Sequence, residues 1–189
     1  MGIAAWILIG AAVLVLLYAI TVYNRLVRLR ALVREGFSGI TVQLRRRADL
    51  IPNLVSTVEG YATHERQVLT EVTAHRGDAV NAGGVRATAQ ADNAFSALLG
   101  RLMAVAEAYP DLKADANFRQ LQEELSEVEE QLQGARRYYN ATVRDLNTRI
   151  QSFPDLLFAS PLGFSEEPFY TDDDSSIQKA PEVRFGARA

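Results

Sequence analysis

Cysteine is absent from this 189-residue chain, and histidine occurs only twice, as His64 and His75. The absence of thiols excludes disulfides, cysteine nucleophiles and cysteine ligands, but it fits reducing and oxidising compartments alike, because a chain of this length can build its core without disulfides. The spacing Glu-x-x-His, which a carboxylate-bridged di-iron site in a helical bundle requires, does not occur. The Gly-x-Ser-x-Gly sequence of serine hydrolases is also missing. The sequence therefore argues against these classes of enzyme.

Nucleotide and nucleic-acid binding also lack their usual signatures. Gly83 and Gly84 have neither the preceding strand pattern nor the following lysine of a phosphate-binding loop. The formal net charge is −3, and no recognition motif accompanies the arginines. The sequence therefore predicts no cofactor, no small-molecule substrate and no nucleic-acid partner.

A metal site is the remaining candidate for chemistry. Glu71 and His75 are four residues apart, on one helix face, and His64 precedes Glu71 by seven residues. Two nitrogens and a carboxylate could ligate zinc, which would make the chain a metal-dependent enzyme. A solvated pair at i and i+4 explains the same residues, and no groups that would orient the ligands are evident. We therefore expect no metal and no enzymatic activity.

Charge is missing from residues 3–22. A helix of about 20 residues spans roughly 30 Å, the thickness of a bilayer's hydrocarbon core. A cleaved signal is disfavoured because no basic residue precedes the run and Ala19-Ile20-Thr21 is a poor cleavage site. A buried core helix is disfavoured because the rest of the chain is too amphipathic to surround it. The run predicts an uncleaved transmembrane anchor over residues 1–23.

Arginines follow this anchor, and no basic residue precedes it. By the positive-inside rule, the asymmetry predicts a single-pass protein of the cell (inner) membrane, with its N-terminus outside and the bulk of the chain in the cytoplasm. The same arginines could bind anionic lipid headgroups, or they could be ordinary solvated charges. This arginine collar consists of Arg25, Arg28, Arg30 and Arg34.

Between residues 24 and 153, apolar residues recur at helical spacing and no strand pattern appears. Pro52 removes an amide donor and clashes with the preceding turn, so we expect a helix to end or kink near Asp49. A second helix is expected from there to about Arg76. The glycines between residues 77 and 84 predict a loop, and Pro110 ends the third helix.

The last helix of this region has the sharpest periodicity. Its heptads predict a seam against other helices, either within the bundle or between subunits. Asp115 or Asn117 can cap its start, and Phe153-Pro154 closes it. The fold class is therefore all-α: an N-terminal transmembrane helix that continues into an antiparallel four-helix bundle with long helices. The heptad positions are Phe118, Leu125, Leu132, Tyr139, Leu146 and Phe153.

Residues 154–189 differ from the bundle in having several prolines, an acidic cluster at 172–174 and spaced aromatics. This composition predicts an extended C-terminal tail. A disordered tail would carry fewer large apolar groups, so we expect the aromatics to dock on the bundle or on a neighbouring subunit. They are Phe158, Phe164, Phe169, Tyr170 and Phe185.

Arg47 stands out on the apolar stripe because it is in register with Ile40 and Leu54. An arginine there must be paired or reach water. We expect a polar network that joins Arg47 or Asp49 to Tyr138 or Asn140. Such networks more often fix the register of a bundle than carry out catalysis.

Three long segments resemble the LemA family, namely residues 26–65, 99–125 and 135–154, and the ending Ala-Pro-Glu-Val-Arg-Phe is similar as well. Family members usually have Ala and Trp where this chain has Gly36 and Phe37. The resemblance implies a membrane helix followed by a cytosolic helical bundle, in a bacterial inner membrane, without an established enzymatic activity. It also marks positions expected to serve folding or assembly, namely Arg46, Arg47, Asp49, Pro52, Asn53, Arg136, Tyr139 and Asn140.

The leading interpretation is a membrane-anchored scaffold that self-associates as a homo-oligomer and presents a surface to other membrane proteins. Tethering many copies in one membrane raises their effective concentration. One alternative is a membrane-surface module that recognises anionic lipid through the arginine collar. A second is the metal-dependent enzyme considered above.

Overall fold

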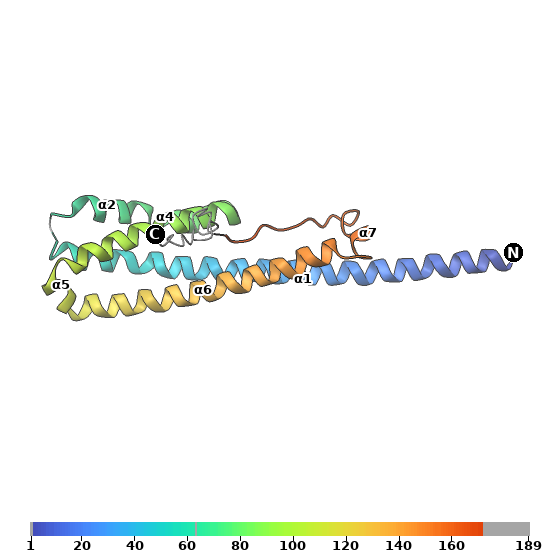
Figure 1. The fold of residues 1–189 in the computed structure, drawn as a ribbon, viewed down its shortest axis with the longest axis horizontal. Helices are drawn as coiled ribbons and strands as arrows, with labels where there is room; N and C mark the ends of the chain where they lie inside the picture. Colours follow the sequence, from blue (N-terminus) through green and yellow to red (C-terminus); the bar gives the residue numbers. More distant parts are fainter. Residues whose placement is uncertain (1, 63, 172–189) are drawn as a thin grey trace, which may run out of the picture.

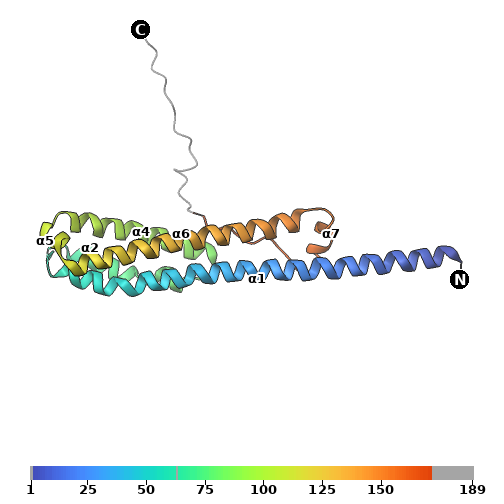
Figure 2. The same ribbon diagram turned by 90° about the horizontal axis from the view of Figure 1, so that it is seen from below.

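The described part of the chain, residues 2–62 and 64–171 of a computed structural model, is helical and contains no strand. The helices are α1 (Ile3–Glu59), α2 (Arg66–His75), α3 (Asp78–Asn81), α4 (Val85–Glu107), α5 (Pro110–Ala114), α6 (Ala116–Gln151) and α7 (Leu156–Ala159). In two perpendicular views, α6 lies along α1, and the N-terminal part of α1 projects beyond all other elements (Figures 1 and 2). The all-helical expectation is confirmed for these residues.

Helix α1 has 57 residues and changes its surroundings along its length. Most large apolar side chains from Ile3 to Ile20 are exposed, whereas Val22 and Leu26 are buried against the rest of the chain. From there the buried positions recur every three or four residues, as one stripe that faces mainly α6, with α2 and α7 packed against parts of α1. A single helix therefore runs from the expected anchor of residues 1–23 into the expected bundle of residues 24–153.

The expected break at Pro52 is wrong, because α1 continues through Pro52 to Glu59. A proline inside a helix costs about 3 kcal/mol. Here Pro52 lies on the exposed face, while Ile51, Leu54 and Val58 are completely buried on the opposite one. Burial of a large aliphatic side chain is worth about 1.5–3 kcal/mol, so three of them outweigh the proline. The chain turns at Gly60 instead.

The middle of the chain folds back on this distal part of α1. Helix α2 packs on α1 and α4, and the loop expected between residues 77 and 84 contains the short helix α3. Gly84 precedes α4 with a φ of 89°, a conformation that favours glycine. Helix α4 ends at Glu107, and Pro110 starts α5, as its fixed φ allows at a first helical position.

Helix α6 confirms the heptad seam up to its last member. The side chain of Asp115 caps its start by accepting a hydrogen bond from the Phe118 amide at 3.0 Å. The seam residues from Phe118 to Leu146 are buried, and they pack mainly on α1 of the same chain. Phe153, beyond the end of the helix, is 80% exposed. The seam is thus used within the chain.

The core consists of two clusters along this pair of helices. The distal cluster joins α1, α2, α4, α5 and the first half of α6 around side chains such as Leu54, Val72, Leu102 and Phe118. The cluster nearer the N-terminus joins α1 and α6 to α7 and to Phe164 and Tyr170.

The described part of the tail combines a short helix with an extended strap. After α7, residues 164–171 are extended and run back along α6 toward α4 (Figure 1). Phe164 and Tyr170 are buried and Phe158 is partly buried, as expected for docked aromatics, whereas Phe169 is 41% exposed. Phe185, Pro181 and the acidic cluster lie outside the described residues.

Candidate functional site: a buried ion centre and a tail clamp

Arg47 is the most deeply buried arginine of α1, with 2% of its surface exposed. Its place on the apolar stripe directs the guanidinium into the space between α1, α4 and α6. There it donates to Asp92 Oδ1 at 2.5 Å and to Ser96 Oγ at 3.2 Å. Its Nη1 also lies 3.4 Å from Glu129 Oε2. Arg47 is thus paired, as the sequence requires, but its partners are not those expected.

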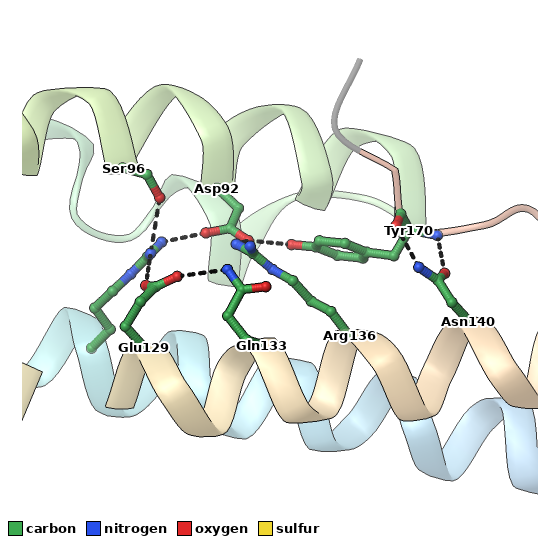
Figure 3. Close-up of polar contacts among 8 residues, drawn as sticks. Asp92, Ser96, Glu129, Gln133, Arg136, Asn140 and Tyr170 are labelled. Atoms are coloured by element: carbon green, nitrogen blue, oxygen red, sulfur yellow. Dashed lines mark hydrogen bonds and ion pairs between the residues drawn. The ribbon is translucent and has the colours of Figure 1, made fainter. Parts of the chain in front are cut away.

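Asp92 of α4 is the centre of the site and is completely buried. Its Oδ1 accepts from Arg47, and its Oδ2 accepts from Arg136 of α6 and, at 2.6 Å, from the Tyr170 hydroxyl of the strap. Figure 3 shows these groups converging from α4, α6 and the strap. One carboxylate therefore connects four separate parts of the chain. We call Arg47, Asp92, Arg136 and Tyr170 the ion centre.

The charges of the site balance. Two guanidinium groups face the buried carboxylate of Asp92 and that of Glu129, whose side chain is 43% exposed. Gln133 donates to Glu129 at 3.1 Å and holds it in place. Arg47 and Arg136 also lie over aromatic rings, 5.1 Å from the centroid of Phe95 and 5.5 Å from that of Tyr170. The site therefore neutralises its own ions without a ligand.

The surroundings raise the pKa of two members of the ion centre, Arg136 and Tyr170, and so keep both protonated as hydrogen-bond donors. Burial is the largest single effect and lowers the pKa of Arg136, but the charge of Asp92, the hydrogen bond to it and the nearby Tyr170 and Glu129 together outweigh burial and raise that pKa. Burial, the hydrogen bond to Asp92 and its charge all raise the pKa of Tyr170 far above the ordinary range. Arg136 thus stays charged and Tyr170 stays a neutral donor.

A second set of contacts, the tail clamp, fixes the strap along α6. The side-chain amide of Asn140 donates to the Tyr170 carbonyl at 2.9 Å and accepts from the Tyr170 amide at 2.8 Å. Asn147 makes the same pair of bonds with Glu167, both at 2.9 Å. Seven helical residues rise about 10.5 Å and three extended residues about 10 Å, so both asparagines match the strap at once.

Tyr139, next to Asn140, contributes to the clamp from the buried face of α6. Its hydroxyl donates to the Pro168 carbonyl at 2.8 Å, and burial raises its pKa to about 12. Opposite it, a Cβ on Gly36 would lie 3.1 Å from the Tyr139 Cα atom, so α1 and α6 approach closely here. Gly36, one of the positions at which the chain differs from the family it resembles, thus lies at a close contact between α1 and α6.

The remaining predicted assembly residues lie outside both sets. The expected direct bond from Arg47 or Asp49 to Tyr138 or Asn140 is not formed. Asp49, Pro52, Asn53 and Tyr138 are exposed. Arg46 makes only surface contacts, with Gln131 at 3.4 Å and Glu127 at 3.6 Å. Arg47 is connected to Asn140 only indirectly, through Asp92 and Tyr170.

The arginine collar is divided by the structure. Arg25, Arg28 and Arg34 are exposed. Arg30 instead donates to the Gly163 carbonyl at 2.9 Å and stacks 4.2 Å from the centroid of the Phe164 ring. Three of the four collar residues are therefore free to face a membrane surface.

The proposed zinc ligands have other partners. Among the described residues, no three His, Asp or Glu side chains are grouped so that they could hold a metal ion. His75 contacts Asp78 at 2.7 Å, and Glu71 contacts Arg101 at 2.8 Å. A hydrogen bond from Gln67 leads the effects that lower the pKa of Glu71. His64 is exposed on the turn before α2.

Sequence reasoning missed Asp92 and Asn147, and it expected Tyr170 to dock without identifying its partner. Asp92 carried a usable signal, because it lies on the apolar stripe three residues before Phe95 and is the acid that a buried Arg47 needs. Asn147 is seven residues after Asn140, in the same helical register. Tyr170 gave no comparable signal, since an extended segment has no periodicity that identifies its partner.

Comparison with known proteins places this arrangement in context. The family model described as LemA family matches residues 36–185. Magnetosome protein MamQ 2 of Paramagnetospirillum magneticum (strain ATCC 700264 / AMB-1) is 26% identical over 176 residues, which cover 79% of this chain and 65% of that protein. Magnetosome protein MamQ of Magnetospirillum gryphiswaldense (strain DSM 6361 / JCM 21280 / NBRC 15271 / MSR-1) is 24% identical, with 78% and 64% covered.

A further relative, Protein LemA of Metamycoplasma hominis (strain ATCC 23114 / DSM 25592 / NBRC 14850 / NCTC 10111 / PG21), is 25% identical over 131 residues. That alignment covers 69% of this chain and 60% of the relative. The chain thus spans slightly less than two thirds of the length of the relatives it matches.

Proposed function

The chain belongs to the LemA family, and on that premise we propose that it is a single-pass, non-catalytic membrane scaffold. One observation carries the proposal: α1 is continuous from an exposed apolar segment into the packed core. Helix α1 is long and apolar enough to cross a membrane. At 1.5 Å per residue, the part from Val22 to Glu59 extends about 55 Å beyond that segment. The protein would hold its distal end far from the bilayer.

The buried ion centre supports a structural role. Asp92 is inaccessible to a substrate, and Arg47, Arg136 and Tyr170 each direct a hydrogen bond to its carboxylate. Side chains of α1, α2, α4 and α6 meet in the distal core, which supports the antiparallel four-helix bundle that the sequence favours. In this proposal the ion centre fixes the register of that bundle and the clamp fixes its strap.

Membrane insertion is tested by alkaline carbonate extraction of membranes that contain the full chain. We expect the wild type to stay in the membrane pellet and the double variant Leu14→Lys/Leu17→Lys to become extractable, because each central lysine costs about 2.5–3.5 kcal/mol. Val27→Lys, at an exposed position beyond the apolar run, is the matched control and should stay. Equal extraction of the wild type and the double variant would contradict the proposal that α1 is inserted in the membrane.

Orientation follows in the same proposal from the arginine collar, with the N-terminus outside and the bundle in the cytoplasm. Because the chain has no cysteine, a single Ser126→Cys substitution, at an exposed position of α6, reports on which side of the membrane this helix lies. A membrane-impermeant maleimide should label it only after the cells are opened. Labelling in intact cells would show that the orientation is the reverse of the one proposed.

Self-association remains part of the proposal, although the heptad seam no longer argues for it, since α1 covers that seam. Its support is the anchor, which confines copies to one membrane and raises their effective concentration. The mass of the detergent-solubilised full chain tests it. A monomer at all protein concentrations would contradict a homo-oligomeric scaffold.

Recognition of anionic lipid is a second candidate function, favoured by the exposure of Arg25, Arg28 and Arg34 just beyond the apolar run. A fluorescent probe on an Ala31→Cys variant, in nanodiscs with labelled anionic or zwitterionic lipid, measures local enrichment by energy transfer. We expect anionic enrichment that salt weakens and that replacement of the three arginines by glutamine abolishes. Equal transfer to both lipids would reject this function.

A further inference from the structure

The turn after α6 is apolar and uncharged on its surface. Residues 152–165 contain one charged residue, Asp155, in a chain of which 23% is charged. Three large apolar side chains at this turn face solvent, with Phe153 80%, Leu156 51% and Leu157 61% exposed. We call these three residues the apolar tip. Exposed groups of this size, close together, mark a surface that is covered by something else.

The apolar tip lies beside the end of the apolar run of α1. The Tyr18 hydroxyl donates to Asp155 Oδ1 at 2.6 Å, and the rings of Tyr18 and Phe158 are 5.6 Å apart. Figure 1 shows α7 next to α1, at the place where α1 continues alone toward the N-terminus. Tyr18 precedes Val22, the last residue of the run, by four residues, which is about 6 Å along a helix. The tip is therefore level with the last turn of the proposed span.

The two charges at this depth, Asp155 and Arg149, pair with each other, and the Arg149 side chain is 32% exposed. Asp155 is 1% exposed and forms an ion pair with Arg149 of α6, while Tyr18 contacts its other oxygen. A charge near hydrocarbon is tolerated when it is buried in protein and paired. The charged collar residues come later along α1, beginning with Arg25. What the tip offers to its surroundings is thus apolar.

From this geometry we infer that the apolar tip is a second membrane contact, inserted beside α1 into the lipid leaflet on the arginine side. Apolar side chains of interfacial segments lie about 5–10 Å deep, at the boundary between headgroups and acyl chains, which matches the level of Tyr18. The inference rests on the proposed membrane span of α1. A bilayer is the occupant that the position favours, because the tip continues the apolar surface of the span.

The test uses the full chain in lipid vesicles, with one cysteine introduced at a time into this cysteine-free sequence. Leu157→Cys, with Leu156→Cys as a second position, carries an environment-sensitive fluorophore at the tip. Leu14→Cys reports the span, and Val42→Cys, 59% exposed on the distal side of the collar, is the matched aqueous control. The readouts are quenching of the probe's fluorescence by iodide in the aqueous phase and by lipids that carry a quencher near the headgroup or near the end of the acyl chain.

The Leu157 probe is expected to be quenched more by the shallow lipid quencher than by the deep one, and several-fold less by iodide than the Val42 probe. If Leu157 behaves like Val42 while Leu14 is quenched by lipid, the tip inference is overturned and the span stands. If Leu14 also lacks lipid quenching, the membrane span itself fails. If shielding of Leu157 disappears as the protein is diluted in lipid, a second copy covers the tip and the inference is overturned.

Discussion

Replacing Asp92 by asparagine tests the ion centre most directly. The change preserves shape but removes the negative charge that Arg47 and Arg136 share, and their side chains are only 3% and 12% exposed. Breaking a buried ion pair by removing one partner costs about 3–5 kcal/mol. The Tyr170 hydroxyl loses its charged acceptor as well, so we work with a total of about 4–6 kcal/mol.

For a packed region of this size, 1 kcal/mol shifts the midpoint of unfolding by about 2–4 °C, so Asp92→Asn should lower it by roughly 10–20 °C. The assay is circular dichroism at 222 nm during thermal unfolding of the full chain in detergent micelles. Glu127→Gln removes a carboxylate from a surface pair of similar chemistry, whose side chains are 45% and 55% exposed, and is the matched control. It should change stability by less than about 1 kcal/mol.

A quadruple apolar variant separates the loss of pairing from the loss of packing. Replacing Arg47, Asp92, Arg136 and Tyr170 by Met, Leu, Met and Phe leaves no buried ion or hydroxyl without a partner, since the side chain of Glu129 is 43% exposed, and exchanges of buried ions for apolar residues are often neutral or stabilise by about 1–4 kcal/mol. If Asp92→Asn is no worse than Glu127→Gln, the carboxylate is not the buried, paired group described here. The reasoning about the ion centre would then be refuted.

Three further predictions concern the clamp, the cap and the helix contact. Asn140→Leu should lower the unfolding midpoint and expose the strap to protease, because it leaves both backbone groups of Tyr170 unpaired at a cost of about 2–3 kcal/mol. The control variant Asn53→Leu, at an exposed site, should change neither the midpoint nor the cleavage of the strap. The hydrogen bond from the Phe118 amide lowers the pKa of Asp115 in the folded chain. The stabilisation by the cap is therefore complete above the ordinary pKa of about 3.9, and it is lost as the pH falls through the lowered pKa. The difference in midpoint between wild type and Asp115→Ala should therefore be larger at pH 7 than at pH 3, and an equal difference would contradict it. Gly134→Ala should stabilise the chain by about 0.5–1 kcal/mol, because the added Cβ has only a side-chain atom, 3.9 Å away, near it. Gly36→Ala should gain less stability, because its Cβ meets the backbone of α6. Equal gains in stability would argue against the close contact between α1 and α6.

The sequence predicted the regular parts of the fold well. The heptads of α6, its cap at Asp115 and the stripe of α4 follow from local patterns that the fold only has to bury. Pro52 was misjudged because its local penalty competes with the burial of three aliphatic side chains on the opposite face, which depends on tertiary contacts. The turn at Gly60 has no proline and was missed for the same reason.

The site was predicted in part. An arginine on an apolar stripe demanded a partner, and Arg47 has one, but the periodicity of α1 cannot say which helix supplies it. The partner Asp92 is 45 residues away along the chain, and it is selected by how α4 packs on α1 and α6. Asn140 was singled out as a polar residue within the helical pattern, but it bonds to backbone atoms of the strap, which carry no sequence signature.

The continuity of α1 has a mechanical consequence. Transmembrane helices tilt by 0–40°, and the tilt depends on the thickness of the bilayer around them. Since α6 lies along α1 for most of the packed region, a change of 10° in tilt would swing the end near Glu59 sideways by about 10 Å over its 55 Å length. In the proposed membrane-anchored protein, α1 would therefore act as a lever that converts small changes in the bilayer into large displacements at its distal end.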